Sequence, residues 1–360
     1  MNSIGIDVGK KQCRASIKDQ HGRILDELSF SNDIAGIRSL LSTASRYGDA
    51  RAVVESTGNM WMRIHDVLEE NGIETVLANP VKTKLIAQAK IKSDKLDSRI
   101  LADLLRGDLV YESYVPSKEF REKRSLVRHR VGLVKARTAL RNKVHALLDK
   151  YEYKTKLSDI FGKAGLGWLK ELELSPIDRV IMDTSIASVV NLSIQIGVVS
   201  THIAKYAWDS RDVRLLLSMN GFDIFSAMVI ATEIVDIRRF PTPWKLVAYA
   251  GLAPSQRESA GKTRYGKITK QGSRVLRWIM VQSARNAVRC DDRFKAYYER
   301  IQHRKGDGKA VVAVAKEMLV VVWHMLTKQE EYRGVREELY KRKLAKLEKF
   351  SSGSTEELDE

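Results

Sequence analysis

The first hundred residues alternate short apolar runs with amphipathic segments. The runs "SIGIDV", "CRASIK", "RILDELSFS", "RAVVEST" and "IETVLANP" have the length and composition of β-strands. Between them, "DIAGIRSLLSTASRYG" and "NMWMRIHDVLEENG" repeat apolar residues at helical spacing, with Asp33 as the N-cap of the first helix. The pattern predicts an α/β domain over residues 1–112, in which three strands come first and helices alternate with strands afterwards.

The pattern changes after this domain, and two long helices are expected. Residues 117–150 form the first helix, and a second apolar helix follows Pro176 after a loop near "FGKAGLG". We expect the two to pair as an antiparallel, coiled-coil-like arm over residues 113–212. The seam of the first helix is predicted from leucines that recur every seven residues: Leu126, Leu133, Leu140 and Leu147.

Residues 213–335 are predicted to form a mainly helical third domain. A turn at Asn220–Gly221 separates two helical runs, and it is either a helix-hairpin-helix turn that holds a phosphate or a plain helical turn. The apolar run 310–326 is shorter than a membrane span of roughly 20 residues and contains Lys316 and Glu317, so we expect a buried helix. Residues 336–360 read as a charged helix followed by a disordered tail.

The balance of charge indicates a polyanionic partner. Lys and Arg number 62 against 45 Asp and Glu, a formal charge of +17, which favours nucleic acid over a basic enzyme without such a partner. Residues 117–156 hold thirteen basic and four acidic residues, so the first arm helix is either a face for RNA or DNA or a solvated surface. The candidate contacts on it are Arg128, Arg130, Arg137, Arg141 and Lys143.

Cysteine usage and the start of the chain point to the cytoplasm. Cys13 and Cys290 are far apart in sequence and form neither a disulfide framework nor a zinc pattern, which fits a reducing compartment. The opening "MNSIGIDVGKKQ" reaches charged residues too early for a signal peptide.

Four carboxylates are candidates for a metal site in the first domain, whose order of elements is typical of a ribonuclease-H-like fold. Asp7 and Glu55 end two expected strands, and ligands gather at the carboxyl ends of strands in such sheets. Asp94 and Asp97 are spaced to share one face of a helix. Carboxylates without Cys or His suit Mg²⁺.

Simpler explanations of the same residues remain open. Asp94 can cap a helix, Asp97 can pair with a neighbouring cation, and Glu55 can form a strand-end ion pair. The segment "GIDVG" also occurs at the first phosphate loop of actin-like sugar kinases, where a second Asp-Gly loop is needed; Asp307–Gly308 is the later candidate.

The stretch "RESAGKTRYGKITKQGSRVLR" carries Ser259 with no histidine within forty residues on either side. A serine is a poor nucleophile without help, so Ser259 is either a turn residue or a nucleophile assisted by a metal ion. Tyr265 either stacks on a base or packs against the protein. The cations expected to hold nucleic-acid backbones around the serine are Lys262, Arg264, Lys267, Lys270, Arg274 and Arg277.

Together, "GIDVGKK", "VVEST", "SDKLDSRILADLLR" and "LVAYAGLAPSQRESAGKTRYGKITKQGSRVLRWIMVQSA" resemble the DEDD transposases of the insertion-sequence one-ten family, the bridge-RNA-guided recombinases. The resemblance covers residues 3 to about 326. It implies a RuvC-like domain, a coiled-coil arm and a C-terminal transposase domain. One departure is Ala260, where the family often has glycine. The residues that it implies for magnesium binding are Asp7, Glu55, Asp94 and Asp97, with Ser259 as the nucleophile.

The resemblance also implies what the enzyme does and with which partners. Donor and target DNA would be cut and rejoined through a covalent phosphoserine, a noncoding RNA would specify the sites, and dimers would assemble into a tetramer. Two other classes compete with this interpretation. A structure-specific endonuclease similar to Holliday-junction resolvases would use water as nucleophile and leave Ser259 inert, and a degenerate element protein would only bind nucleic acid.

Overall fold

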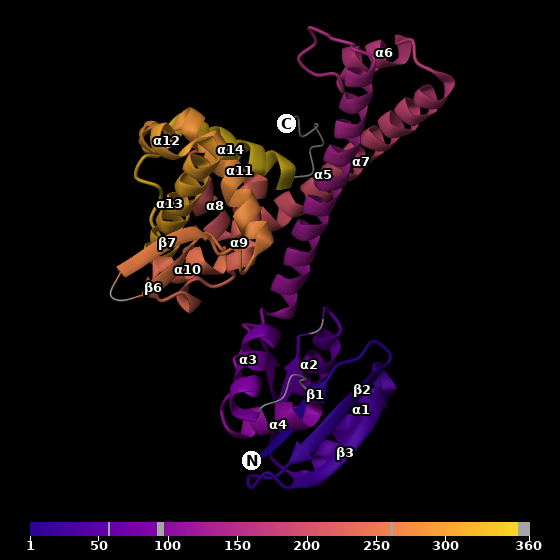
Figure 1. The fold of residues 1–360 in the computed structure, drawn as a ribbon, viewed down its shortest axis with the longest axis vertical. Coiled ribbons are helices and arrows are strands. Elements are labelled where there is room, and N and C mark those ends of the chain that lie inside the picture. The colour runs from indigo at the N-terminus through magenta and orange to yellow at the C-terminus, as the bar shows by residue number, and fades with distance from the viewer. Residues whose placement is uncertain (57, 92–96, 260–261, 352–360) are drawn as a thin grey trace. The chain divides into compact units, whose positions relative to one another are not determined.

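The structure is a computed structural model that describes residues 1–56, 58–91, 97–259 and 262–351, with the backbone alone at 89–91, 257–259 and 262–265. The chain divides into two compact units, Met1–Pro116 and Ser117–Glu360 (Figure 1). The first unit ends four residues after the boundary expected at 112, and the arm and the third domain belong to one unit.

The first unit contains a mixed five-stranded sheet of order β3-β2-β1-β4-β5. β1 pairs antiparallel with β2, β2 pairs antiparallel with β3, and β1, β4 and β5 run parallel. All five strands predicted from the sequence are present. Their bounds are β1 Asn2–Asp7, β2 Gln12–Lys18, β3 Ile24–Ser31, β4 Ala50–Glu55 and β5 Glu74–Ala78.

Helices cover both faces of this sheet because its central strands are apolar on both sides. Ile4 and Ile6 pack with residues of α1 and α2 on one face, while Val53 packs against Leu101 of α4 on the other. Asp33 caps α1 as expected, its Oδ1 accepting from the Gly36 N–H at 2.8 Å. The helices are α1 Ile34–Ala44, the short helix Ser45–Tyr47, α2 Trp61–Glu70, α3 Pro80–Ile91 and α4 Ser98–Arg106.

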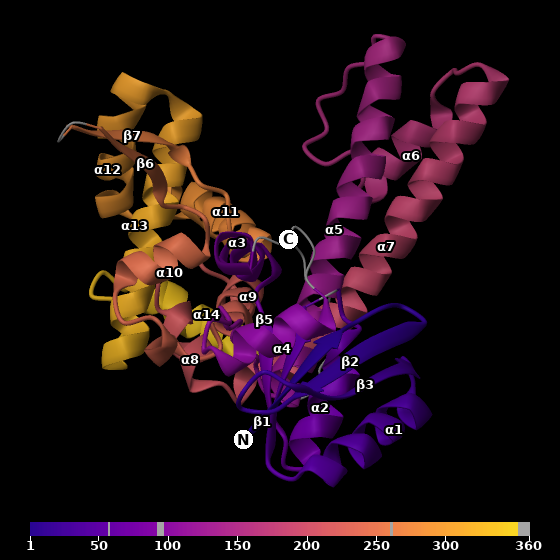
Figure 2. The ribbon, with the colours of Figure 1, turned by 60° about the horizontal axis from the view of Figure 1, so that its bottom comes forward.

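The second unit begins with two long antiparallel helices, α5 Lys118–Lys150 and α7 Pro176–Trp208, joined through α6 Lys163–Glu171. Figures 1 and 2 show α5 and α7 side by side. The predicted apolar seam is confirmed in part: Leu147 is buried and the leucines at 126, 133 and 140 are half-buried, while Val127, Val131 and Val144 beside them are buried. α5 contacts α9 near its start as well as α7 along its length, so its buried face follows two partners and not one coiled-coil partner.

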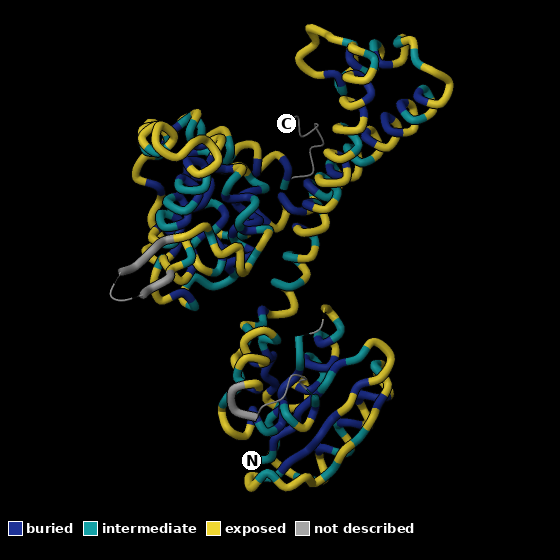
Figure 3. Tube along the Cα trace, in the orientation of Figure 1, coloured by how far each residue is buried: buried dark blue, intermediate teal, exposed yellow. Residues whose placement is uncertain are grey.

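The roots of both arm helices continue into the core of the rest of the unit. Val127, Ile203 and Ala207 belong to the same buried cluster as Met228 and Met318. Figure 3 colours the buried stretches of this unit dark blue. This shared core explains why the arm is not a separate compact unit. The remaining elements are α8 Arg211–Leu217, α9 Ile224–Ile234, the short helix Ile237–Arg239, α10 Pro243–Tyr249, β6 Pro254–Ser259, β7 Lys262–Ile268, α11 Arg274–Cys290, α12 Asp292–Lys305, α13 Asp307–Lys328 and α14 Glu337–Ser351.

The apolar run 310–326 lies in α13, and its side chains at Val314, Met318 and Val322 are fully buried, which confirms a core helix. Two helices, α7 and α13, are long and apolar enough to cross a membrane by length and composition alone. α14 confirms the charged C-terminal helix, while the tail predicted to be disordered lies outside the described residues from 352 onward.

Candidate active site

Asp7 and Glu55 lie next to each other at one edge of the sheet. They end β1 and β4, which are parallel neighbours with Ile6 opposite Val54. Both side chains are half-buried. Burial, and after it the negative charge of Asp7, raises the pKa of Glu55 above its usual value. The structure therefore brings two of the four predicted acids together, and their charges oppose each other.

Asp97 also lies toward this edge, although not as the sequence predicted. α4 runs antiparallel to β1, because Ser98 packs against Gly5 near one end and Asp103 pairs with Lys18 near the other. A Cβ on Gly5 would lie 2.0 Å from the carbonyl oxygen of Ser98, so only glycine allows this approach. The start of α4 is consequently at the Asp7 end of β1.

The helix begins one residue after Asp97, so the expectation that Asp94 and Asp97 share one helical face is wrong. Asp97 is the N-cap of α4, and its Oδ1 accepts from the Ile100 N–H at 3.0 Å. The capping role had been considered for Asp94, which lies outside the described residues. An N-cap residue has a non-helical backbone, and its side-chain oxygen accepts a hydrogen bond from an amide in the first turn of the helix.

The donor set fits a hard divalent cation only in part. Asp7 and Glu55 offer carboxylate oxygens whose mutual repulsion a dication would relieve. Within the described ranges, however, no three or more His, Cys, Asp or Glu side chains are grouped closely enough to hold a metal ion. Asp7 and Glu55 are thus the residues that would bind the cation, and a complete site needs acids beyond this pair.

The sugar-kinase alternative receives no support from Asp307. This residue begins α13, accepts from the Tyr298 hydroxyl at 2.6 Å and lies 3.7 Å from Arg285 Nη2. It belongs to the second unit and does not follow a strand. Its neighbours give it a local role at the start of a helix.

Ser259 is the last residue of β6 and pairs with Lys262 of β7, so it lies at the tip of an antiparallel hairpin. The sequence suggests a turn residue as one of two alternatives for Ser259, and it does not predict a hairpin in this mainly helical domain. Ala260 lies outside the described residues, and the side chain of Tyr265 is not among those described.

The cations around the serine fall into three groups. The side chains of Lys262 and Arg264 lie outside those described, and Lys267, Lys270 and Arg274 are exposed. Arg277 is half-buried and donates from Nη1 to the carbonyl oxygens of Ala250 at 3.0 Å and Lys270 at 3.1 Å. Arg277 therefore has contacts inside the protein that the sequence pattern did not indicate.

Most of the arginines predicted to contact nucleic acid on the arm also have intramolecular partners. Arg130 donates to Ser200 Oγ at 2.6 Å and lies over the Phe225 ring. Arg137 is 8% exposed and donates to Ser193 Oγ at 3.2 Å. Arg141 lies over the Phe161 ring, 4.9 Å from its centroid, whereas Lys143 is exposed.

Arg128, whose side chain is 49% exposed, pairs with a buried acid that the sequence analysis missed. Its Nε and Nη2 donate to the two carboxylate oxygens of Glu233 at 2.8 and 3.0 Å. Glu233 is fully buried and also accepts from the Ser273 hydroxyl at 2.9 Å. A lone acid inside the apolar run "SAMVIATEIV" was the available signal, because a buried carboxylate requires a cation and hydrogen-bond donors.

The Asn220–Gly221 turn is a plain helical turn, because the side chain of Asn220 donates to groups within the protein. Asn220 is 3% exposed and donates from Nδ2 to Asp291 Oδ2 and the Gly334 carbonyl, both at 2.8 Å. A Cβ on Gly221 would lie 2.7 Å from the backbone nitrogen of Ala287. The turn is packed against α11 and leaves no room there for a phosphate.

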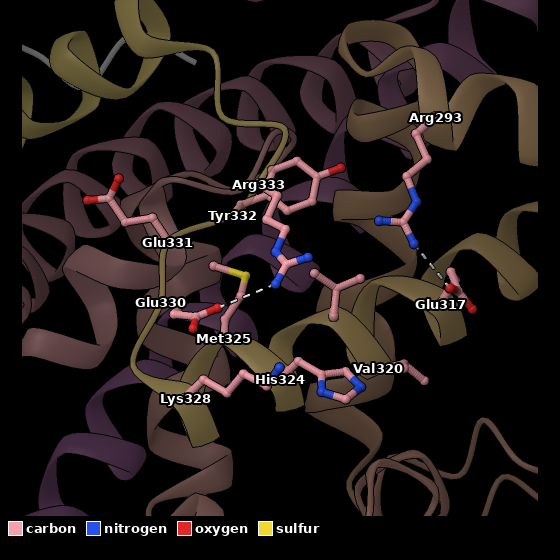
Figure 4. A pocket seen from close by; sticks show the side chains of 11 residues that line it. Arg293, Glu317, Val320, His324, Met325, Lys328, Glu330, Glu331, Tyr332 and Arg333 are labelled. Atoms are coloured by element: carbon pink, nitrogen blue, oxygen red, sulfur yellow. Dashed lines mark ion pairs between the residues drawn. The ribbon is translucent and has the colours of Figure 1, made fainter.

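A cavity of about 320 Å³ lies beside α13, and none of the residues that line it is a predicted site residue. Val320 and Met325 contribute apolar surface, and two ion pairs line its rim, Arg293–Glu317 at 3.5 Å and Arg333–Glu330 at 3.9 Å (Figure 4). Because both signs of charge line the cavity and are paired with each other, it selects no class of ligand.

Comparison with known families connects both units to transposition. Residues 4–152 match a model of DEDD transposases of the IS110 group, described as "Transposase". Residues 213–299 match a second model, described as "Transposase IS116/IS110/IS902 family". The two matches cover the stretches that carry Asp7, Glu55, Asp97 and Ser259.

Relatives in several bacteria resemble the chain over most of its length. The "Transposase for insertion sequence element IS1111A" of Coxiella burnetii is 24% identical over 345 residues, 92% of this chain and 91% of that protein. A "Probable family 20 transposase" of Pseudomonas aeruginosa is 27% identical, covering 92% of this chain and 99% of that protein. The "Transposase for insertion sequence element IS1328" of Yersinia enterocolitica is 22% identical, covering 84% and 86%.

Proposed function

Because this chain belongs to the IS110/IS116 family of insertion-sequence transposases, enzymes that cut and join DNA, we propose a specific chemistry for it. DNA is cut and rejoined through a covalent bond to Ser259, with Mg²⁺ bound at the sheet edge that carries Asp7 and Glu55. The observation that carries the proposal is the adjacency of these two half-buried acids at the ends of paired strands; burial, and after it the like charge of Asp7, raises the pKa of Glu55. An unfavourable pair of this kind is typical of a cation site.

The strand arrangement supports a ribonuclease-H-like, RuvC-like first domain. Three antiparallel strands are followed by two parallel ones, in the order β3-β2-β1-β4-β5, with helices on both faces. Asp7 ends the central strand and Glu55 ends its parallel neighbour, which is where ligands bind in open α/β sheets. Asp94 and Asp97, from the start of the α4 region, complete the proposed set of four acids.

In the proposed reaction, the Ser259 hydroxyl forms a bond to phosphorus and the 3′-oxygen of the same phosphodiester leaves. The proton lost by the serine is balanced by the proton that the leaving 3′-hydroxyl gains. One phosphate ester forms for each one that breaks, so rejoining needs no external energy source. When bound, the divalent cation supplies Lewis-acid neutralisation of the phosphate charge, which replaces an adjacent histidine base.

Nucleic acids are the proposed partners of the second unit. The net charge of +17 and the exposed cations Lys267, Lys270 and Arg274 support binding of DNA strands near the hairpin. Lys118, Lys135 and Lys143, which are exposed on α5, support binding of a structured guide RNA, which would specify the donor and target sites.

A second copy of the chain is the proposed occupant of the outer face of α7, and such dimers would pair into a tetramer. Ile177, Val180, Ile194 and Val198 are between 57% and 75% exposed and follow alternating steps of three and four residues together with Thr184, Ala187 and Asn191. Between Arg179 and Lys205, Asp183 is the one Asp, Glu, Lys or Arg in the sequence. This lack of cations disfavours nucleic acid and lets two positively charged copies approach.

The competing function is hydrolytic cleavage by the carboxylates alone. Incubating the protein and its guide RNA with end-labelled DNA distinguishes the two, since hydrolysis releases free ends and transesterification leaves protein attached to a 5′-phosphate. Both require a divalent cation, so cleavage that persists in EDTA contradicts the metal site itself.

A further inference from the structure

Backbone hydrogen bonds hold together the two segments that flank the β6–β7 hairpin. The Lys270 N–H donates to the Gly251 carbonyl at 3.1 Å, and the Ser273 N–H donates to the Tyr249 carbonyl at 2.8 Å. Thr269 continues the same pairing by donating to Ala253 at 2.9 Å. The root of the hairpin is therefore a defined piece of structure, formed by residues 249–253 and 269–273.

Two glycines allow the segments to approach this closely. Gly251 has φ +67° and Gly272 has φ +100°, conformations that favour glycine. A Cβ on Gly272 would lie 2.1 Å from the Tyr249 carbonyl oxygen, and one on Gly251 would lie 2.5 Å from Arg277 Nη1. The guanidinium of Arg277 thus lies directly against the root.

One nitrogen of Arg277 joins both segments of the root. Nη1 donates to Ala250, which precedes β6, at 3.0 Å and to Lys270, which follows β7, at 3.1 Å. Burial, and after it the charge of Arg274, lowers the pKa of Arg277, but an arginine side chain keeps its charge in proteins. Charge-assisted bonds of this kind are stronger than neutral ones, so Arg277 fixes the separation of the two segments.

The helix that carries Arg277 is itself anchored. Ser273 caps α11 by accepting from the Leu276 N–H at 3.1 Å, and its hydroxyl donates to fully buried Glu233 at 2.9 Å. Glu233 in turn accepts from both Arg128 donors. The chain of contacts runs from α5 through α9 to the start of α11, so Arg277 extends from a fixed platform.

We propose that Arg277 is a positioning residue that holds the root of the hairpin and thereby places Ser259, at the end of β6, for reaction. The inference rests on the nucleophilic role proposed for Ser259. It differs from the sequence-based expectation that Arg277 contacts a phosphate, because its Nη1 donates to two carbonyl oxygens of the protein. A positioning residue changes the rate of the bound complex, whereas a phosphate contact changes DNA affinity and its salt dependence.

The test compares Arg277→Met, which keeps an unbranched stem and loses the donors, with Arg289→Met, which removes one positive charge from an exposed position on the same helix. Two quantities are measured: hydrogen exchange of the Thr269 and Lys270 amides, and the rate of covalent adduct formation at saturating DNA. Arg277→Met is expected to lower both the protection and the rate at least tenfold, with an unchanged salt slope of DNA binding. Arg289→Met is expected to stay within twofold for both.

The outcomes separate this inference from the proposed function. Unchanged amide protection in Arg277→Met overturns the proposal that Arg277 holds the root of the hairpin. If, in addition, the salt slope of DNA binding falls by about one, Arg277 contacts a phosphate instead. If the wild type forms no adduct, the nucleophilic role fails while amide exchange still decides whether Arg277 holds the root. Should Arg277→Met not fold, Arg277→Lys keeps the charge and changes the donor geometry, and we expect it to show an intermediate loss of amide protection. Full amide protection in Arg277→Lys contradicts the proposal that Arg277 holds the root of the hairpin.

Discussion

At the scale of single residues, the pair Asp7 and Glu55 decides whether the first unit has a metal-dependent function. Burial, and after it the negative charge of Asp7, raises the pKa of Glu55, so the ionised form of Glu55 is disfavoured where the two strands end. Asp97 contributes to the same region as a helix cap, so its carboxylate is already partly engaged.

Asp7→Asn and Glu55→Gln are each expected to abolish strand cleavage while leaving RNA retention and thermal unfolding nearly unchanged. A neutral amide is a poor ligand for a hard dication and cannot balance its charge. Strand cleavage is measured on labelled DNA with Mg²⁺. Asp7→Asn should also lower the pKa of Glu55 toward its usual value, so the fraction of ionised Glu55 at pH 5 rises, as carboxyl ¹³C NMR would detect.

Full cleavage by either variant would remove the pair from the site. A pKa of Glu55 that does not move in Asp7→Asn would show that burial alone accounts for its elevation.

At the scale of elements, the arm shows why charge pattern alone misplaces functional residues. The sequence marks Arg128 and Lys143 as equivalent cations on one helix, and the structure pairs the first with a buried acid and exposes the second. Arg128→Gln would leave Glu233 buried without its cation and is expected to lower the free energy of unfolding by about 2 kcal/mol. Lys143→Gln is expected to change it by less than about 0.5 kcal/mol.

RNA binding should respond in the opposite order. Lys143→Gln is expected to reduce the salt slope of RNA binding by about one, and Arg128→Gln to leave that slope unchanged. Urea unfolding and filter binding across a salt series measure the two effects. A stability loss in Lys143→Gln larger than that in Arg128→Gln contradicts the assignment.

The elements themselves were largely predictable, because local periodicity specifies them. The five strands of the sheet, the Asp33 cap and the buried helix α13 follow from alternation, capping residues and apolar length. What the sequence could not show depends on tertiary partners. The leucine seam of α5 is only partly buried because α9 packs against the start of this helix. The hairpin of Ser259 was not predicted because basic, glycine-containing strands lack an apolar alternation.

The part of the candidate site that lies at strand ends was predictable from the sequence. Asp7 and Glu55 meet because parallel neighbours end at the same edge. Because α4 begins at Ser98, Asp97 lies outside the helix, and the prediction that it shares a helical face with Asp94 does not hold. Arg277 and Glu233 were missed or misassigned because their partners are distant in sequence, which spacing within one segment cannot reveal.

At the scale of the whole molecule, the proposed contact between two copies through the outer face of α7 is open to a direct test. Ile194→Glu on the outer face of α7 is expected to convert dimers to monomers, because it places a charge in an apolar interface. Ser188→Glu, on an exposed position six residues before Ile194 in the same helix, is the control and should leave the mass unchanged. Light scattering of the RNA-free protein at micromolar concentration measures the mass, and a wild type that is monomeric there contradicts this interface.

The proposed reaction likewise involves the whole molecule, since the proposed metal-binding acids belong to the first unit and Ser259 belongs to the second. The structure also affects the choice of controls. Ser273 caps α11 and donates to Glu233, so its alanine variant would disturb the platform below the hairpin. Ser255→Ala, within β6, is the better match for Ser259→Ala.

The most direct measurement is a denaturing gel of end-labelled DNA incubated with the protein, its guide RNA and Mg²⁺. The account predicts a slowly migrating band that collapses after protease treatment, is formed by the wild type and Ser255→Ala, and is absent in Ser259→Ala although that variant still binds RNA and DNA. DNA cleavage by Ser259→Ala at the rate of the wild type would contradict the account and assign cleavage to the carboxylates with water as the nucleophile.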